Sequence, residues 1–188
     1  MAMENLNLSK LRILLVEDHV PMRQIISGIL RELGVSKVDY ASDGNEALQK
    51  LWEFEPDIVI TDALMEGMDG VELTKRIRTG HEGVDAFLPV IMISASTGTS
   101  AIVRARDAGI TEFLAKPISP LTVYQRICSV IAAKRPFIRT DGFFGPDRRR
   151  KETFVAQDRR VGEHQYADDE SLGNDKAEPE TETGVAAA

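Results

Sequence analysis

The stretch Asp57-Ile58-Val59-Ile60-Thr61-Asp62-Ala63-Leu64-Met65 decides the fold of this chain. Its apolar run is typical of a central strand of a parallel sheet, buried on both faces, and the run ends on a carboxylate. Two further apolar runs also end on charged residues: residues 14–16 lead into Glu17-Asp18, and residues 113–115 lead into Lys116-Pro117. In an open parallel α/β sheet, ligands bind beyond the carboxyl ends of the strands. We therefore expect these charged side chains to converge on one polar site.

Length and composition indicate one globular domain with an appendage. The chain has 188 residues, a hydrophobic fraction of 43% and a net charge of −7, and this charge argues against nucleic-acid binding by the whole surface. A single cysteine excludes an internal disulfide framework. The sequence shows neither a signal peptide nor an apolar stretch long enough for a membrane span, so we expect a cytoplasmic protein.

Apolar periodicity predicts five strands that alternate with five helices. The predicted strands are residues 11–16, 38–40, 57–61, 89–94 and 113–115, and the predicted helices are residues 21–33, 46–54, 71–78, 99–108 and 119–134. This alternation favours an α/β fold with a doubly wound, five-stranded parallel sheet, flavodoxin-like, in the order 2-1-3-4-5. Its first and third strands are then neighbours, which sets Glu17-Asp18 beside Asp62.

Three carboxylates at adjacent strand ends predict a cation site. Taken singly, the acidic pair is equally well explained as a solvated loop that opens a helix. Taken together, close carboxylates repel one another and require a cation. Mg²⁺ binds carboxylate oxygens, waters and phosphate oxygens, and Lys116 adds a second positive charge. This set of groups suits phosphoryl transfer to Asp62.

The residues that follow Asp62 carry a family resemblance. The segment Asp62-Ala63-Leu64-Met65-Glu66-Gly67-Met68-Asp69-Gly70 resembles the D-x-x-M-P-x-M-D-G motif of receiver domains in two-component response regulators. The acidic pair, Ser94-Ala95 and Lys116-Pro117 complete the resemblance, which covers about residues 10–135. The chain is thus identified as a single, chemotaxis-regulator-like receiver domain.

The resemblance implies the roles of the acidic residues. Asp62 would be the phosphoacceptor, taking its phosphoryl group from a histidine kinase or a phosphotransfer protein. Asp18 and Asp62 would bind Mg²⁺ directly and Glu17 largely through water, with the backbone carbonyl of Leu64 as a further ligand. The protein would be a signalling switch and no enzyme, although it would carry Mg²⁺-dependent self-phosphorylation and dephosphorylation chemistry.

The resemblance also implies a switch. Lys116 would pair with the phosphoryl group, Ser94 would donate its hydroxyl to a phosphoryl oxygen, and Phe113 occupies the aromatic switch position. A partner protein, unknown from the sequence, would bind the face formed by the fourth helix, the fifth strand and the last helix. Lys116-Pro117 resembles the cis peptide of the family.

Two residues depart from the family pattern. Glu66 replaces the usual proline, which predicts a more acidic and less rigid loop after Asp62. Phe113 lacks the hydroxyl of the more common tyrosine, so packing alone would set its orientation.

Residues 136–188 form an extension that we expect to be largely irregular. It carries the basic run Arg148-Arg149-Arg150 and then turns acidic and rich in small residues. It shows no helix-turn-helix pattern, and it is too short for a DNA-binding output domain. The arginines are a candidate anion-binding segment, because guanidinium groups bind phosphates through two hydrogen bonds.

Three alternatives stay open. The arginine run would suit a cyclic-dinucleotide-responsive binding protein that uses the receiver as a scaffold. A pseudo-receiver would act as a constitutive adaptor. A phosphoester hydrolase would need a second acid two residues after Asp62, where this chain has Leu64.

Overall fold

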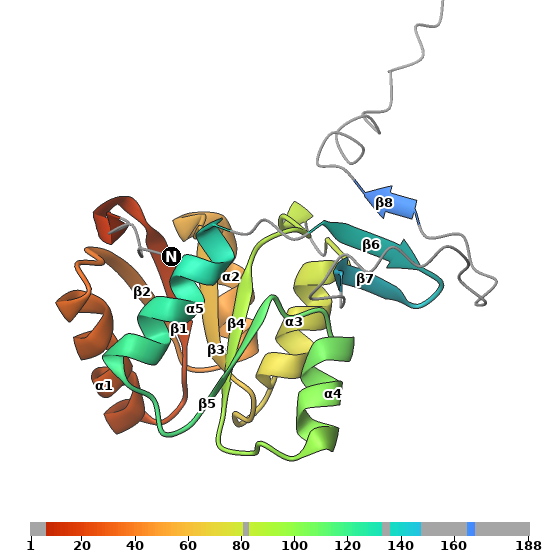
Figure 1. Cartoon of the computed structure of the whole chain (residues 1–188). Helices are drawn as coiled ribbons and strands as arrows, with labels where there is room; N and C mark the ends of the chain where they lie inside the picture. The colour runs from red at the N-terminus through yellow and green to blue at the C-terminus, as the bar shows by residue number, and fades with distance from the viewer. Residues whose placement is uncertain (1–6, 81–82, 133–135, 148–164, 168–188) are drawn as a thin grey trace, which may run out of the picture.

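The predicted alternation of strands and helices is confirmed by the structure, a computed structural model that describes residues 7–80, 83–132, 136–147 and 165–167 (Figure 1). The strands of the main sheet are β1 (Arg12–Val16), β2 (Lys37–Ala41), β3 (Ile58–Asp62), β4 (Val90–Ser94) and β5 (Glu112–Ala115). The helices are η1 (Leu8–Lys10), α1 (Val20–Glu32), α2 (Gly44–Phe54), α3 (Gly70–Arg78), α4 (Thr99–Asp107) and α5 (Pro120–Ala132). All four strand pairs are parallel, and the order β2-β1-β3-β4-β5 is the predicted doubly wound, flavodoxin-like order.

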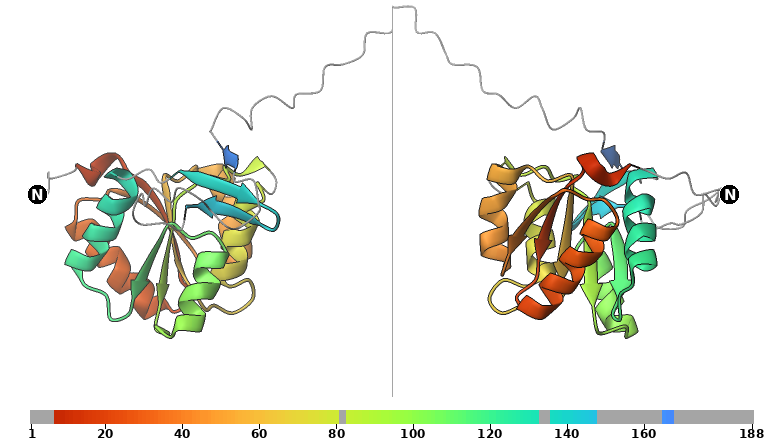
Figure 2. Two further views of the ribbon diagram at one scale, coloured as in Figure 1. Left: turned by 45° about the vertical axis from the view of Figure 1, so that its right-hand side comes forward. Right: turned by 90° about the vertical axis from the view of Figure 1, so that its left-hand side faces the viewer.

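Helices cover both faces of the sheet, as Figure 2 shows. Along β1, Ile13 and Leu15 pack in the cluster that holds α1 and α5, whereas Leu14 and Val16 pack against α2 and α3. Side chains alternate between the two faces of a strand, so a run that is apolar throughout is what a strand covered on both faces requires. Among the described helices, none has the length and apolar composition of a membrane-spanning segment.

Strand register brings the polar residues to one edge of the sheet. Val16, the last residue of β1, pairs with Thr61 of β3. The next residues, Glu17 and Asp62, therefore lie side by side at this edge of the sheet. Ser94, the last residue of β4, pairs with Ala115 of β5. The carboxyl ends of four strands therefore meet where the candidate site was predicted.

Part of the C-terminal extension, which we expected to be largely irregular, forms three short strands. Strands β6 (Phe137–Thr140), β7 (Phe143–Pro146) and β8 (Gln165–Ala167) form a second, antiparallel sheet in the order β7-β6-β8. The hairpin β6–β7 lies at the end of the molecule opposite the carboxyl ends of the strands (Figures 1 and 2). Its aromatic side chains pack on a phenylalanine of the main body, a tertiary contact that gives these short strands their stability.

Candidate functional site

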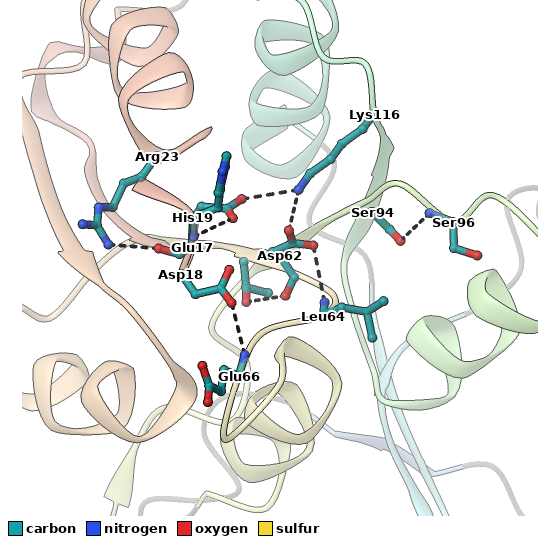
Figure 3. A network of polar contacts seen from close by, with 11 residues as sticks. Glu17, Asp18, His19, Arg23, Asp62, Leu64, Glu66, Ser94, Ser96 and Lys116 are labelled. Carbon is teal, nitrogen blue, oxygen red and sulfur yellow. Dashed lines mark hydrogen bonds and ion pairs between the residues drawn. The ribbon is translucent and has the colours of Figure 1, made fainter. Parts of the chain in front are cut away.

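Lys116 joins two acidic side chains at the carboxyl edge of the sheet (Figure 3). Its Nζ forms an ion pair with Asp62 Oδ2 and lies 3.4 Å from Glu17 Oε2. The side chains of Glu17, Asp62 and Lys116 are 1%, 11% and 17% exposed. The attraction between these charges is therefore only weakly screened by water.

Burial and neighbouring charges both act on the pKa values of Glu17 and Lys116. Burial raises the pKa of Glu17, and the charge of Asp62 raises it further, against the opposing effect of Lys116. For Lys116, burial alone would lower the pKa, but the hydrogen bond and charge of Asp62, together with Glu17, raise it overall. Two close carboxylates thus share one ammonium group, and a further positive charge would stabilise them.

Asp18 lies beside this pair, with its carboxylate turned toward the β3–α3 loop (Figure 3). Its Oδ2 accepts a hydrogen bond from the backbone N–H of Glu66 at 3.2 Å. In the same loop, the backbone N–H of Leu64 donates to Asp62 Oδ1 at 3.4 Å. The first of these bonds exists only because residue 66 is not proline, since proline has no backbone N–H.

The donor chemistry fits Mg²⁺, although the ligands are not yet gathered around one point. Asp18, Asp62 and Glu17 supply carboxylate oxygens at one edge, and Leu64 adds a backbone carbonyl next to Asp62; these are hard oxygen donors of the kind Mg²⁺ takes. Within residues 7–80, 83–132 and 136–147, however, no three acidic, imidazole or thiol side chains are grouped closely enough to hold a metal ion. Asp62 forms its ion pair with Lys116, and Asp18 accepts its hydrogen bond from Glu66.

Ser94 ends β4 and Phe113 lies in β5, so both are on the opposite side of β3 from the acidic residues that follow β1. Ser94 is buried, and its Oγ accepts a hydrogen bond from the N–H of Ser96 at 3.1 Å. Ser94, Leu64 and the half-buried Phe113 line one cavity of about 170 Å³ that extends to α4. Ser94 and Phe113 thus border the same cavity as Ala63 and Leu64, the two residues that follow Asp62. The predicted cis peptide between Lys116 and Pro117 is confirmed.

Backbone packing behind Asp62 involves two residues whose role the sequence analysis missed. Thr61 Oγ1 donates to the carbonyl oxygen of Asp62 at 2.9 Å. A Cβ atom placed on Gly70 would lie 2.0 Å from that same oxygen. Gly70 is the first residue of α3, and Asp69 caps the helix by accepting from Glu72 N–H at 2.8 Å. A glycine directly after an N-cap aspartate was the available signal for this close approach.

Arg23 is a further neighbour that no motif indicated. One of its guanidinium nitrogens donates to the backbone carbonyl of Glu17 at 3.0 Å, which ties the first turns of α1 to the end of β1 (Figure 3). The candidate anion-binding residues Arg148, Arg149 and Arg150 lie outside the described residues, so the cyclic-dinucleotide alternative stays a prediction.

Fold and site together define a receiver domain, and the comparison of sequences agrees. The chain belongs to the response regulator receiver domain family, whose model matches residues 13–128. It is similar to the chemotaxis protein CheY-3 of Vibrio cholerae, with 36% identity over 125 residues, 66% of this chain and 95% of that protein. It is also similar to the chemotaxis protein CheY of Pseudomonas aeruginosa, with 33% identity over 117 residues, 62% of this chain and 93% of that protein.

Solved structures support the same assignment. The chemotaxis protein CheY4 of Vibrio cholerae superimposes with a TM-score of 0.58 at 31% identity, covering 64% of this chain and 98% of that chain. A complex of CheX, CheY, BeF₃ and Mg²⁺ from Borrelia burgdorferi gives a TM-score of 0.57 at 30% identity, covering 64% of this chain and 89% of that chain. The protein is therefore a two-component response regulator, and its class of function is phosphorylation-dependent signalling.

Proposed function

We propose that Asp62 is the phosphoacceptor and that Lys116 and the neighbouring acids make its carboxylate reactive toward a phosphoryl donor. The observation that carries this proposal is the contact of one half-buried ammonium group with both Asp62 and Glu17 at the carboxyl edge of the sheet. Asp62 lies at the end of the central strand β3. Its Oδ2 accepts a hydrogen bond from Lys116, and its Oδ1 accepts one from the backbone N–H of Leu64. An oxygen held in this way is oriented for attack, and the groups around it are ready to accept the incoming charge.

The chemistry follows from these contacts. A carboxylate oxygen of Asp62 attacks phosphorus, the bond from phosphorus to the donor atom breaks, and an acyl phosphate forms. Lys116 then moves its ion pair from the carboxylate to a phosphoryl oxygen. The hydroxyl of Ser94 donates to another phosphoryl oxygen once it turns toward Asp62. Each residue thus exchanges an existing contact for one that the phosphoryl group provides.

Mg²⁺ is the cofactor that this donor set would hold. Asp18 and Asp62 would bind it directly, Glu17 through water, and Leu64 through its carbonyl. When bound, the ion neutralises negative charge on the acids and on the transferred group. Because Glu17 is buried, a cation beside it would stabilise the ionised form of its carboxyl group.

The donor in this proposal is a histidine kinase or a phosphotransfer protein, and the output is a change of the face formed by α4, β5 and α5. The cavity of about 170 Å³ beside Ser94 and Phe113 supports this direction of change, because it leaves room for the β4–α4 loop and the Phe113 ring to move inward. Phosphorylation shifts the balance between two conformations only by stabilising one more than the other.

Acetyl phosphate labelling of the full chain with Mg²⁺ tests the proposal. We expect wild-type protein to gain the mass of one phosphoryl group in a form that hydroxylamine removes, as an acyl phosphate requires. Asp62→Asn should abolish labelling, whereas Asp141→Asn, an exposed acid in the hairpin turn, should label as wild type does. Undiminished labelling of the Asp62 variant would overturn the site assignment. Wild-type protein that neither labels nor binds Mg²⁺ would favour the pseudo-receiver alternative.

A further inference from the structure

The hairpin β6–β7 lies beyond residues 13–128, the part that matches the receiver family, yet it is packed onto the receiver. The ring of Phe87, in the loop before β4, lies 4.9 Å from the ring of Phe137 and 5.3 Å from that of Phe144. The two hairpin rings are themselves 5.5 Å apart. The three rings form one aromatic cluster, whose separations and tilts are those that stabilise such groups.

Arg78 lies beneath this cluster and ties it to the receiver. The residue is 6% exposed, at the end of α3, and its guanidinium group donates to the carbonyls of Ala86, Leu88 and Gly109 at 2.7–2.8 Å. The carbon at the centre of the group stands 5.1 Å from the Phe137 ring. Its second terminal nitrogen has no hydrogen-bond partner among the described residues, and the guanidinium group as a whole lies over the face of the hairpin ring. The hairpin therefore completes the environment of a buried cation.

A second contact joins the hairpin to the turn between α4 and β5. A Cβ atom on Gly145 of β7 would lie 2.9 Å from the Cα of Gly109, and one on Gly109 would lie 2.9 Å from the carbonyl oxygen of Phe144. The two backbones can approach this closely only because both residues lack a side chain. Since Arg78 also bonds the carbonyl of Gly109, this turn is held from two sides.

Helix α4 is fastened at that turn and loosely packed elsewhere. Ala105, near its C-terminal end, is the one residue of α4 that is buried. The first turn of α4 borders the cavity of about 170 Å³ that Ser94 and Phe113 also line. The contacts of the hairpin thus hold the C-terminal end of a helix that has few buried contacts of its own.

We propose that the C-terminal hairpin restrains the switch: by clamping the α4–β5 turn it stabilises the conformation described here and opposes the movement of α4 that accompanies phosphorylation. This inference rests on the proposed function of Asp62. Coupling between two sites is reciprocal. A hairpin that disfavours the phosphorylated conformation must itself be loosened when the phosphoryl group, or a mimic of it, occupies the site.

Two substitutions on opposite sides of the contact test the proposal. Phe87→Ala removes the receiver side of the aromatic cluster, and Phe144→Ala removes the hairpin side. Ile25→Ala is the control, because it removes an exposed apolar side chain from α1, a helix that carries none of these contacts. Full-length proteins are titrated with beryllofluoride and Mg²⁺, the pair present in the Borrelia complex. Hydrogen exchange of residues 137–147 and of β1 and β3 is followed by mass spectrometry.

We expect Phe87→Ala and Phe144→Ala each to lower the half-saturating beryllofluoride concentration by about twofold to tenfold. The double variant should show little further change, because both substitutions break one contact. In wild-type protein, ligand binding should speed exchange in residues 137–147 and leave β1 and β3 protected. Ile25→Ala should behave as wild type does.

The outcomes separate this inference from the function on which it rests. Wild-type protein that does not bind beryllofluoride would refute the proposed function, and the restraint with it. Wild-type protein that binds, with unchanged hairpin exchange and variant affinities equal to its own, would refute the restraint alone. Weaker binding by both variants, with β1 and β3 still protected, would also refute it, because the hairpin would then support the phosphorylated conformation.

Discussion

Gly70→Ala tests how strongly the reactivity of Asp62 depends on the backbone behind it. Gly70 starts α3, and its Cβ position lies 2.0 Å from the carbonyl oxygen of Asp62 and 2.8 Å from Thr61 Oγ1. Because the φ angle of Gly70 is not positive, alanine suits its conformation, and the whole effect comes from this contact. The obstacle is backbone, which cannot rotate away as a flexible side chain would.

The magnitude follows from that distance. Cβ atoms essentially never approach within 3.0 Å of such an atom, so the carbonyl of Asp62 and the start of α3 must separate by about 1 Å, a displacement that costs on the order of 10²-fold in rate at a reacting group. Overpacking of this kind also destabilises a fold by about 1–3 kcal/mol. We therefore expect a large loss of phosphorylation rate with a moderate loss of stability.

The assay is the initial rate of acetyl phosphate labelling, with urea unfolding of the same samples. Gly28→Ala is the matched control, because a Cβ there meets nothing within 4 Å and alanine should stabilise the interior of α1 by about 0.5–1 kcal/mol. Gly44→Ala should be intermediate, since its Cβ meets the flexible side chain of Met68. If folded Gly70→Ala protein labels within about twofold of wild type, the argument from close approach is wrong.

Three further predictions concern single contacts. Glu66→Pro removes the backbone N–H that donates to Asp18 and so frees that carboxylate for a cation. Calorimetry should then show Mg²⁺ binding tightened by about twofold to tenfold. Glu66→Gln keeps the N–H and should not reproduce this gain. Glu17→Gln should stabilise the protein in metal-free buffer. The folded-state pKa of Glu17 is raised above 4.5, so ionisation of this residue costs stability as the pH rises. The advantage of the variant in urea unfolding should therefore grow as the pH rises above 4.5. Arg78→Lys should lower the unfolding free energy by about 2–4 kcal/mol, because a single ammonium group cannot serve three carbonyls in the planar arrangement of a guanidinium; unchanged stability would contradict that view of the clamp.

Much of the main fold was predictable because each element carries a local pattern that agrees with its tertiary role. Residues 58–60 are apolar on both faces of β3, the central strand of the sheet. Strand order then follows from the connectivity rules, and strand order places Glu17 beside Asp62. The site was predictable for the same reason: its residues stand at strand ends, where topology alone determines which of them meet.

The hairpin was not predictable in this way. Strands β6 and β7 have four residues each, and a two-stranded hairpin of that length is marginal by itself. Its partners, Phe87 and Arg78, lie in parts of the chain that read as a loop and as a polar helix end, and nothing local indicates that they face residues 137–146. The contact is decided by tertiary packing alone.

The orientation of Asp18 lies between these two cases, and it shows what a motif leaves open. The motif identifies an acid at the end of β1, but it does not say which hydrogen bond that acid makes when no cation is bound. Here the answer depends on Glu66, because the residue supplies a backbone N–H where the family pattern has proline. That bond stabilises one of several close negative charges, so in the proposed function it would compete with Mg²⁺ for the same carboxylate. A departure from the motif that leaves every acidic residue in place can therefore change the affinity of the site while its chemistry stays the same.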